Sequence, residues 1–392
     1  MLIEAPERFE QYGSVRIYDV SKVLELDSLA SRNPTGTYKL DYSELEDIGS
    51  RTAIVVPVKN EELFTLEGVL AGIPHLSPII LVSASSRLPI DRYKHEMALS
   101  KNFYYRTDRP IVTVHQRDPF WGEYLSGTQL EELLDDSGVV RKGKGEGMIL
   151  GVMIAKYLGY EYVGFIDSDN YVPGSVHEYA WTYYAGFAMA ESKGSMIRIQ
   201  WPYKAKLQES EVYLRRRGRV SRVTNSVMNH VLTMIRRIET DIIKTANSGE
   251  HALSMDLATE MRWAGEFAVE PFEYIYLLEK CWIEKDENGC PMIKEGVKII
   301  QLESRNPHIH ASRDDEHLIE MLALSLGTIY HSKLVNDSLK KYVIETLRNY
   351  GYTGKEPPKP RVYPPIKSVD IDKIVSHVLS ESLDARIYGL NP

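Results

Sequence analysis

Two aspartates one residue apart follow an apolar stretch near the middle of the chain. Asp167 and Asp169, with Ser168 between them and Asn170 next, come directly after the strand-like run 162–166. Carboxylates at the end of a buried strand are suited to a divalent metal, which would offset the charge on a departing nucleoside diphosphate. The alternative is a solvated turn that only caps a helix. The pattern therefore predicts either a metal site or a structural turn.

Two histidines in the second half could complete such a metal site. His308 and His310 lie in the segment RNPHIH, and in an extended segment both side chains would point to the same side. One imidazole beside two carboxylates is ordinary coordination for a divalent metal, whereas a lone histidine often makes only a structural hydrogen bond. We expect Mg or Mn as the ion, with Co or Zn as alternatives.

A glycine-rich basic segment, RKGKGEG at 141–147, precedes a helix predicted from about Met148 to Leu158. Its backbone N–H groups and Lys144 could bind a phosphate or a nucleobase. The spacing lacks the GxxxxGK[ST] pattern, which argues against a P-loop kinase. The alternative interpretation is a flexible, solvated surface loop.

A second basic segment, RRRGRVSRVTN at 215–225, gathers arginines and hydroxyl groups immediately before a predicted helix. Arginine binds phosphate or carboxylate through two parallel hydrogen bonds, and the start of a helix adds backbone donors. The expected ligand is a small phosphorylated acid. RNA is the rival ligand, but no interleaved aromatic residues or wider basic face support it.

An alternation of strand-like and helix-like patterns must position these residues. Short apolar runs of this kind are typical of parallel strands that are buried on both faces. Ser175 is expected to cap the helix that follows the aspartates. We therefore expect an α/β fold whose ligand site lies beyond the strand ends. The predicted strands are 52–58, 78–83, 111–115, 162–166, 195–201 and 297–302.

The second half has a different sequence pattern, with several predicted helices, and it is expected to form a lid or an acceptor-binding region. A long helix is predicted with an apolar stripe from Met228 to Ile242, and GEH at 249–251 is expected to open another helix. Further helices are expected from near Ser312 and Ser338. The closing amphipathic helix, 370–379, should either pack back on the chain or form a homodimer contact.

Composition limits the class of protein. The chain has 392 residues, 43% of them hydrophobic, and a net charge of −8, so it can bury a large core but is unsuited to bulk nucleic-acid binding. No run approaches a membrane span and no signal peptide is evident, so we expect a cytoplasmic protein without membrane contact. In that reducing compartment Cys281 and Cys290 are expected to be structural thiols, and a disulfide between them on a hairpin is the less favoured alternative.

Six segments, taken in order over most of the chain, resemble mannosyl-3-phosphoglycerate synthases: VVPVKNEE, KGKGEG, DSDN, GRVSRVTN, SGEHALS and SRNPHIHAS. That family is similar to other retaining glycosyltransferases, including glucosyl-3-phosphoglycerate synthases. It transfers mannose from GDP-mannose to the 2-hydroxyl of 3-phosphoglycerate, and its product is the precursor of the compatible solute mannosylglycerate. The resemblance implies a Rossmann-like GT-A fold with a mixed, mostly parallel sheet. It implies a donor-binding half at 1–210 and an acceptor-binding, helical region at 211–392.

The resemblance also implies a role for individual residues. Asp167, Asp169 and Glu250 would be catalytic, and Asp167 and Asp169 would hold the metal together with His308 or His310. Arg219, Ser221, Thr224 and Asn225 would bind 3-phosphoglycerate. The residues implied for the donor are Pro57, Lys59, Asn60, Glu61, Lys144, Asp167, Ser168 and, facing the sugar with Glu250, His251.

Two mechanisms and two further classes of protein are compatible with these motifs, and within the same class a glucosyl-3-phosphoglycerate synthase-like transferase is the alternative. Retention through a carboxylate nucleophile would leave Glu250 as the candidate, but we favour front-face substitution, in which the acceptor hydroxyl attacks from the side of the leaving diphosphate. A sugar-nucleotide nucleotidyltransferase would use similar residues but release pyrophosphate from a nucleoside triphosphate. A non-catalytic binding protein would show affinity without turnover.

Overall fold

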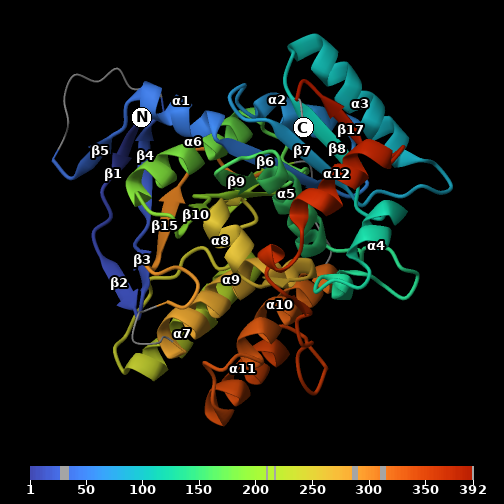
Figure 1. Cartoon of the computed structure of the whole chain (residues 1–392). Coiled ribbons are helices and arrows are strands. Elements are labelled where there is room, and N and C mark those ends of the chain that lie inside the picture. Colours follow the sequence, from blue (N-terminus) through green and yellow to red (C-terminus); the bar gives the residue numbers. More distant parts are fainter. Residues whose placement is uncertain (27–34, 209–210, 216–217, 285–289, 310–314, 391–392) are drawn as a thin grey trace.

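A computed structural model describes residues 1–26, 35–208, 211–215, 218–284, 290–309 and 315–390. Thirteen strands within this part of the chain form one sheet (Figure 1). Eleven of them follow one path, in the order β17 (Arg386–Tyr388), β8 (Ile111–His115), β7 (Ile79–Ser83), β6 (Thr52–Val58), β9 (Tyr162–Phe165), β13 (His251–Ser254), β10 (Ser195–Gln200), β15 (Val297–Glu303), β4 (Ser21–Glu25), β1 (Leu2–Glu4) and β5 (Thr37–Lys39).

The sheet is mixed and mostly parallel at its centre, which confirms the predicted fold class. β6, β7, β8 and β9 run parallel to one another, and β10 runs parallel to β15. β13 lies antiparallel between β9 and β10, and β17 lies antiparallel on β8. The central strands are almost entirely buried, as continuous apolar runs predict.

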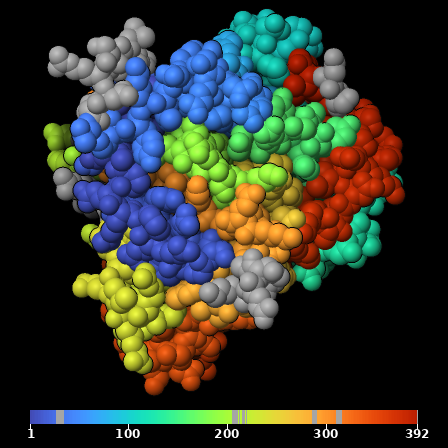
Figure 2. Space-filling model, turned by 60° about the vertical axis from the view of Figure 1, so that its left-hand side comes forward, coloured from blue at the N-terminus to red at the C-terminus, as the bar shows by residue number. Residues whose placement is uncertain are grey.

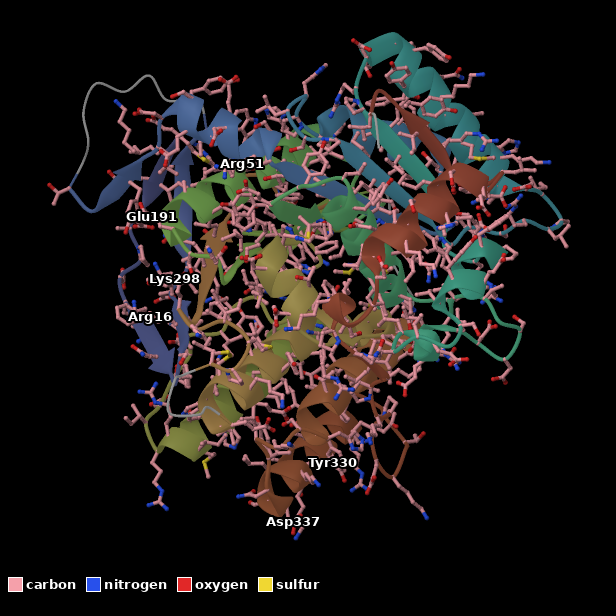
Figure 3. The ribbon with its side chains drawn as sticks, in the orientation of Figure 1. Arg16, Arg51, Glu191, Lys298, Tyr330 and Asp337 are labelled. Carbon is pink, nitrogen blue, oxygen red and sulfur yellow. A yellow bond between two sulfur atoms is a disulfide. The ribbon has the colours of Figure 1, made fainter. Side chains whose placement is uncertain are left out.

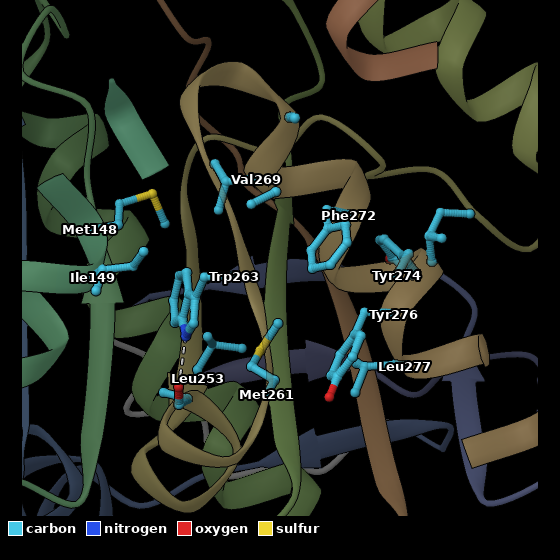
Figure 4. Packing of buried hydrophobic residues seen from close by; sticks show 14 of the residues in the cluster. Met148, Ile149, Leu253, Met261, Trp263, Val269, Phe272, Tyr274, Tyr276 and Leu277 are labelled. Carbon is cyan, nitrogen blue, oxygen red and sulfur yellow. Dashed lines mark hydrogen bonds between the residues drawn. The ribbon is translucent and has the colours of Figure 1, made fainter. Parts of the chain in front are cut away.

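Helices cover both faces of the sheet and divide the core into two apolar clusters. One face carries α1 (Tyr42–Ser50), α2 (Leu63–Gly72), α3 (Arg92–Thr107) and α6 (Pro173–Ala190). The other face carries α4 (Pro119–Leu125), α5 (Lys144–Tyr157), α8 (Met255–Glu260), α9 (Val269–Leu278) and α12 (Ile371–Glu381). Figure 4 shows part of this second cluster, where Met148 and Ile149 of α5 lie near Trp263, whose indole N–H donates to Ala258 O at 2.8 Å.

The second half of the chain adds a layer of helices beyond α9. α10 (Asp315–Tyr330) contacts α7 (Arg219–Arg236), α9 and α11 (Asp337–Asn349). β11 (Lys204–Gln208) and β12 (Glu211–Arg215) form a separate hairpin, and β14 (Trp263–Ala264) pairs with β16 (Val362–Tyr363). The division at residue 210 stays a prediction, and β13 and β15 of the second half belong to the same sheet as the strands of the first.

The N-terminal strands had no clear pattern in the sequence. β2 (Phe9–Tyr12) pairs with β3 (Val15–Tyr18), and β3 lies parallel to β15, where Arg16 and Lys298 are register partners (Figure 3). Figure 2 shows the blue N-terminal segment lying beside the orange segment that contains β15. The sheet therefore extends further toward the N-terminus than the predicted strands indicate.

Several predicted boundaries were wrong. α6 begins at Pro173 after Val172, so Ser175 lies inside the helix, where its hydroxyl donates to Pro307 O at 3.1 Å instead of capping. α7 ends at Arg236 because Arg237 adopts a left-handed conformation, so the predicted stripe to Ile242 leaves the helix. The predicted helix start at Ser312 lies outside the described residues.

The cysteine prediction was also wrong. Cys281 and Cys290 form a disulfide, with Cα atoms 4.3 Å apart across a sequence separation of nine residues. The bond links the helical segment Glu279–Ile283 to the segment that begins at Cys290.

The closing helix α12 packs back on the chain, as one of its two predicted roles requires. It contacts α4 and α5, and its apolar residues Ile374, Val375 and Val378 are buried. Among the described helices, none has the length and apolar character that a membrane span requires.

Candidate active site

The directions of four strands bring the predicted site residues to one edge of the sheet. β9, β10 and β15 point the same way, because the antiparallel β13 separates the first two and the last two are parallel. Asp167 follows β9, His308 follows β15, and Glu250 directly precedes β13. His251 pairs with Phe165, so the start of β13 lies beside the end of β9. This edge is where open α/β sheets bind ligands.

Lys144 lies at the centre of this edge. Its ammonium nitrogen is 2.6 Å from Asp167 Oδ1 and 2.9 Å from Glu270 Oε1 of α9. Although burial opposes the charge, the carboxylates of Asp167 and Glu270 together raise the pKa of Lys144. The second part of the segment predicted as a glycine-rich loop, residues 144–147, is the first turn of α5, which begins at Lys144 itself. Lys144 is therefore a fixed cation rather than part of a flexible loop.

Gly249 permits this close approach. A Cβ atom at Gly249 would lie 2.4 Å from Asp167 Oδ2 and 2.9 Å from Lys144 Nζ, closer than atoms can come. The segment GEH therefore passes directly over the Asp167–Lys144 pair. It enters the strand β13, and the predicted helix opening at GEH was wrong because α8 begins only at Met255.

Glu250 is fully buried, and neither of its carboxylate oxygens has a hydrogen-bond partner among the described residues. Burial, followed by the charge of Asp167, raises the pKa of Glu250 well above its ordinary value. The nearest imidazole nitrogen, His308 Nδ1, is 3.7 Å from Glu250 Oε1. A buried polar group without a partner is costly, and such groups are typical of functional sites.

His308 is held in a fixed orientation beside Glu250. Its Nδ1 is 3.3 Å from the side-chain nitrogen of Asn170, and its ring stacks on Trp201 at 4.5 Å between centroids. Lys204 Nζ lies 4.8 Å from the centre of the same Trp201 ring. The structure thus brings His308, from the segment RNPHIH, beside the segment that contains Asp167 and Asp169. His310 lies outside the described residues.

The chemistry of these side chains suits a divalent cation. Asp167, Asp169 and Glu250 supply carboxylates and His308 an imidazole, and the unpartnered oxygens of Glu250 lie among them. Among the described residues, no three His, Cys, Asp or Glu side chains lie close enough together to hold a metal. Metal binding would therefore require these side chains to move closer to one another. In the described conformation, the ammonium group of Lys144 is the cation bound to Asp167.

The predicted donor residues Pro57, Lys59, Asn60 and Glu61 lie at the end of β6, on the same edge of the sheet as Asp167. Asn60 has a left-handed backbone with φ of 60°. Its N–H donates to Ser85 Oγ at 2.7 Å and its Oδ1 accepts the N–H of Ser86 at 2.8 Å. These bonds fix the loop, while Lys59 is exposed and Ser168 is buried beside the aspartates.

The predicted acceptor residues belong to the first turns of α7, which begins at Arg219 rather than after the basic segment. Ser221 lines a recess with Gly218, Trp201, Lys244 and Ser248, next to Glu250 in the sequence. Two further residues are engaged inside the protein. They are Thr224, whose hydroxyl donates to Val220 O at 3.1 Å, and Asn225, which bonds to Lys244 O at 2.7 Å and to the Ala246 N–H at 2.8 Å.

His251 lies on the opposite side of β13 from Glu250. Its Nε2 is 3.0 Å from Glu273 Oε1, its Nδ1 is 3.1 Å from Ser248 O, and Glu273 also binds Arg198. The ring is fully buried, so the structure does not bring it to the same surface as Lys144. Sequence analysis missed Glu270 and Glu273, although two acids inside the apolar stretch VEPFEYIYLL were a usable signal.

Comparison with known proteins gives a consistent family. The model of the mannosyl-3-phosphoglycerate synthase family matches residues 5–378. A mannosyl-3-phosphoglycerate synthase of Aeropyrum pernix is 48% identical over 390 residues, and one of Pyrococcus furiosus is 41% identical over 395 residues, each over 100% of both chains.

Solved structures agree at the level of the fold. A glucosyl-3-phosphoglycerate synthase of Mycobacterium tuberculosis with Mn²⁺, UDP and glucosyl-3-phosphoglycerate has a TM-score of 0.51 and 20% identity, covering 86% of this chain and 98% of that one. The same enzyme with Mg²⁺ and UDP has a TM-score of 0.52 and 19% identity, covering 89% and 98%. The sheet is thus of the GT-A type. With its full-length relatives and its clustered site, the chain belongs to the mannosyl-3-phosphoglycerate synthase family, and it is a glycosyltransferase that forms mannosyl-3-phosphoglycerate.

Proposed function

We propose that this enzyme uses GDP-mannose as its donor and transfers mannose to the 2-hydroxyl of 3-phosphoglycerate in the cytoplasm, with retention at the anomeric carbon. The observation that supports the proposal most strongly is the convergence of Lys144, Asp167 and Glu250 at the edge of the sheet, with His308 beside them. It provides a cation for a diphosphate and carboxylates for a metal within one site.

In this proposal the donor lies along the edge of the sheet formed by β6 and β9. Pro57, Lys59, Asn60 and Glu61 bind the guanosine, and the rigid bonds of Asn60 keep their loop in place. Lys144 binds the diphosphate, so its ammonium is shared between Asp167 and the phosphate oxygens. Ser168 lies next to the ribose.

Asp167, Asp169 and one histidine, His308 or His310, would hold a divalent metal, of which Mg or Mn suits the oxygen-rich set best. When bound, such an ion neutralises charge on the leaving diphosphate. His308 is suited to this role because Asn170 and Trp201 fix its ring. A ligand whose orientation is fixed by its neighbours binds metal more tightly.

The acceptor is placed in the recess at the start of α7. Ser221 faces this recess. Arg219, whose side chain lies outside the described part of the structure, is the expected partner of the phosphate of 3-phosphoglycerate, and the backbone N–H groups at the start of α7 add further donors. Thr224 and Asn225 support the acceptor site indirectly, because their hydrogen bonds hold α7 against residues 244–246.

Front-face substitution agrees with the state of Glu250. Its raised pKa keeps the carboxyl group protonated to higher pH than an exposed glutamate, and a protonated carboxyl is a poor nucleophile. The acceptor hydroxyl would instead attack from the side of the leaving diphosphate and pass its proton to the departing phosphate oxygen. Lys144 stabilises the charge on that oxygen, and Glu250 and the buried His251 keep the sugar and the strand β13 in position.

The stereochemistry and the role of Glu250 are tested together. Product made from GDP-mannose and 3-phosphoglycerate is analysed by NMR of the anomeric proton, and Glu250→Gln is examined by mass spectrometry for a covalent mannosyl-enzyme. We expect the α configuration of the donor in the product and no covalent adduct. A β product would contradict retention, and an adduct on another acid would contradict front-face substitution. Asp136→Asn, in an exposed turn, is the matched control.

A further inference from the structure

A second cavity, of about 540 Å³, lies on the far side of α9 from Lys144. Phe272, Ile275, Tyr276 and Glu279 line it, and their spacing places them on one face of the helix and its continuation. Glu270 lies on the opposite face, where it contacts Lys144. The end of α10 and residues 359–362 line the rest of the cavity, and none of the lining residues belongs to the catalytic edge of the sheet.

The floor of this cavity is apolar and rigid. Phe272 and Tyr276 stack with ring centroids 5.7 Å apart and an interplanar angle of 19°. Ile275 lies between them in the sequence, and all three side chains are buried except for the faces that line the cavity. A flat apolar surface of this kind is suited to the uncharged part of a small molecule.

The rim is positively charged, although the whole chain carries a net charge of −8. Its four cations are Arg262, Lys280, Lys333 and Lys359, and its two carboxylates are Glu279 and Glu284.

The carboxylates do not balance the cations. Lys280 and Lys333 both bind the single carboxylate of Glu284. In the described part of the chain, neither Arg262 nor Lys359 has an acidic partner. Glu279 accepts the backbone N–H of Lys333 at 2.6 Å, and burial raises the pKa of its carboxyl.

We propose that this cavity is a second anion site, which binds a small phosphate-bearing molecule between Arg262 and Lys359. The unpaired guanidinium and ammonium groups bind the phosphate, and the Phe272–Tyr276 face contacts any organic part of the ligand. An excess of positive charge around a cleft attracts anions, and charge-assisted hydrogen bonds to phosphate are among the strongest in proteins.

The experiment is isothermal titration calorimetry with pyrophosphate and, separately, with ADP, in a metal-free buffer containing EDTA. The proteins are the wild-type enzyme, the double variant Arg262→Gln/Lys359→Gln, the active-site variant Lys144→Met, and Lys355→Gln as a control. Lys355 is an exposed lysine of the same C-terminal segment that does not line the cavity. Hydrogen–deuterium exchange of the wild-type enzyme gives the location independently, through protection of peptides that contain residues 262, 276 and 359.

We expect a binding event that persists in Lys144→Met, where diphosphate binding at the active site is weakened, and in Lys355→Gln. The double variant should weaken this event at least about 10-fold, the effect of losing one charged hydrogen bond. Tighter binding of ADP than of pyrophosphate would identify an organic phosphate as the ligand, and equal affinity would identify phosphate alone. The proposal is overturned if neither probe binds, if Lys144→Met abolishes binding, or if the double variant binds as the wild type does. Because the mannosyl transfer is measured separately, failure here leaves the proposed function intact.

Discussion

At the scale of single residues, Lys144 has the most informative environment. It has two carboxylate partners, Asp167 from the end of β9 and Glu270 from α9, so three distant segments meet at one ammonium group. The neighbouring Glu250, in contrast to Lys144, has no hydrogen-bond partner in the described structure. A paired cation and a buried acid without a hydrogen bond therefore lie close together where the substrates are expected.

Lys144→Met should weaken donor binding more than it impairs the folded state. A charged hydrogen bond contributes about 1.5–3 kcal/mol, so we expect the KM for the nucleotide sugar to rise by about 10- to 100-fold. Steady-state kinetics at varied donor concentration gives this value. The control is Lys142→Gln, an exposed lysine two residues earlier. Equal KM values for Lys144→Met and the wild type would remove Lys144 from the donor site.

The buried carboxyl group of Glu96 should make the free energy of unfolding depend on pH. Glu96 is 1% exposed, and burial raises the pKa of its carboxyl even though the hydroxyls of Ser83 and Ser85 donate to it. The folded state therefore keeps this proton to higher pH than the unfolded chain does. Its stabilising contribution is complete below the unfolded pKa of about 4.3 and is lost as the pH rises through the folded value.

Replacing Glu96 by Gln removes this titration. As the pH rises from about 4 to 8, the unfolding free energy of Glu96→Gln should therefore increase relative to that of the wild type. The increase is about 1.4 kcal/mol for each pKa unit by which folding raises the pKa of Glu96. Urea unfolding at several pH values measures the difference, and Glu44→Gln on the exposed surface of α1 controls for the loss of a charge. A difference that is constant with pH would show that Glu96 does not titrate in this range.

At the scale of elements, the short strand β16 fixes the start of α5. Tyr363 of β16 donates its hydroxyl to Glu146 Oε1 at 2.7 Å, and Glu146 Oε2 accepts the N–H of Glu266 at 2.9 Å. Glu146 lies two residues after Lys144 and is fully buried. The C-terminal segment therefore helps to position the cation of the active site, which is distant from it in the sequence.

Tyr363→Phe should lower the unfolding free energy by about 1–3 kcal/mol, because a buried carboxyl loses a hydrogen-bond donor. It should also raise the KM for the donor through Lys144 while leaving the KM for 3-phosphoglycerate unchanged. Tyr352→Phe is the matched control, since its hydroxyl donates to Glu356 O at an exposed site. An equal rise in both KM values would indicate a general loss of structure instead.

The sequence predicted the buried central strands well, but it predicted the hairpins and the short strand β13 poorly. β6 and β8 have the predicted bounds, because continuous apolar runs leave little choice of period. The hairpins at the N-terminus and at residues 204–215 alternate polar and apolar residues only briefly, so they gave no pattern. GEH was assigned to a helix because its strand, β13, is only four residues long and its direction depends on pairing with β9 and β10.

The site could be predicted by residue type but not by contact. Asp167, Lys144 and His308 were all recognised, whereas the pairing of Lys144 with Glu270 depends on how α9 packs and has no local signal. Thr224 and Asn225 were assigned to the acceptor, and the structure shows them bonded within the protein. Polar residues at the start of a helix are used equally for ligands and for packing, and sequence alone does not separate the two.

At the scale of the whole molecule, the two ends of the chain close opposite edges of one sheet. β5 and β1 lie at one edge and β17 at the other (Figure 1). The N-terminal hairpin is also joined to the second half, because the Ser14 N–H donates to Cys281 O at 2.9 Å and Tyr12 packs edge-on against Trp282. The disulfide therefore lies where the first and second halves of the chain meet.

Removing this disulfide should destabilise the whole fold rather than the active site. Cross-linking a loop of about ten residues contributes about 2–3 kcal/mol in the chain-entropy model, so Cys281→Ser/Cys290→Ser should lose about that much unfolding free energy. Guanidinium unfolding with and without dithiothreitol measures it. The reductant should destabilise the wild type and leave the double variant unchanged. An effect of equal size on both would show that the disulfide makes no contribution in solution.

The most direct test of the whole account is nucleoside diphosphate release with a panel of donors. GDP-mannose, UDP-glucose and ADP-glucose are each incubated with the enzyme, with and without 3-phosphoglycerate, and with Mg²⁺, Mn²⁺ or a chelator. We predict GDP release that requires both GDP-mannose and 3-phosphoglycerate and that disappears with the chelator. Release from UDP-glucose but not from GDP-mannose, or release that persists with the chelator, would contradict the account.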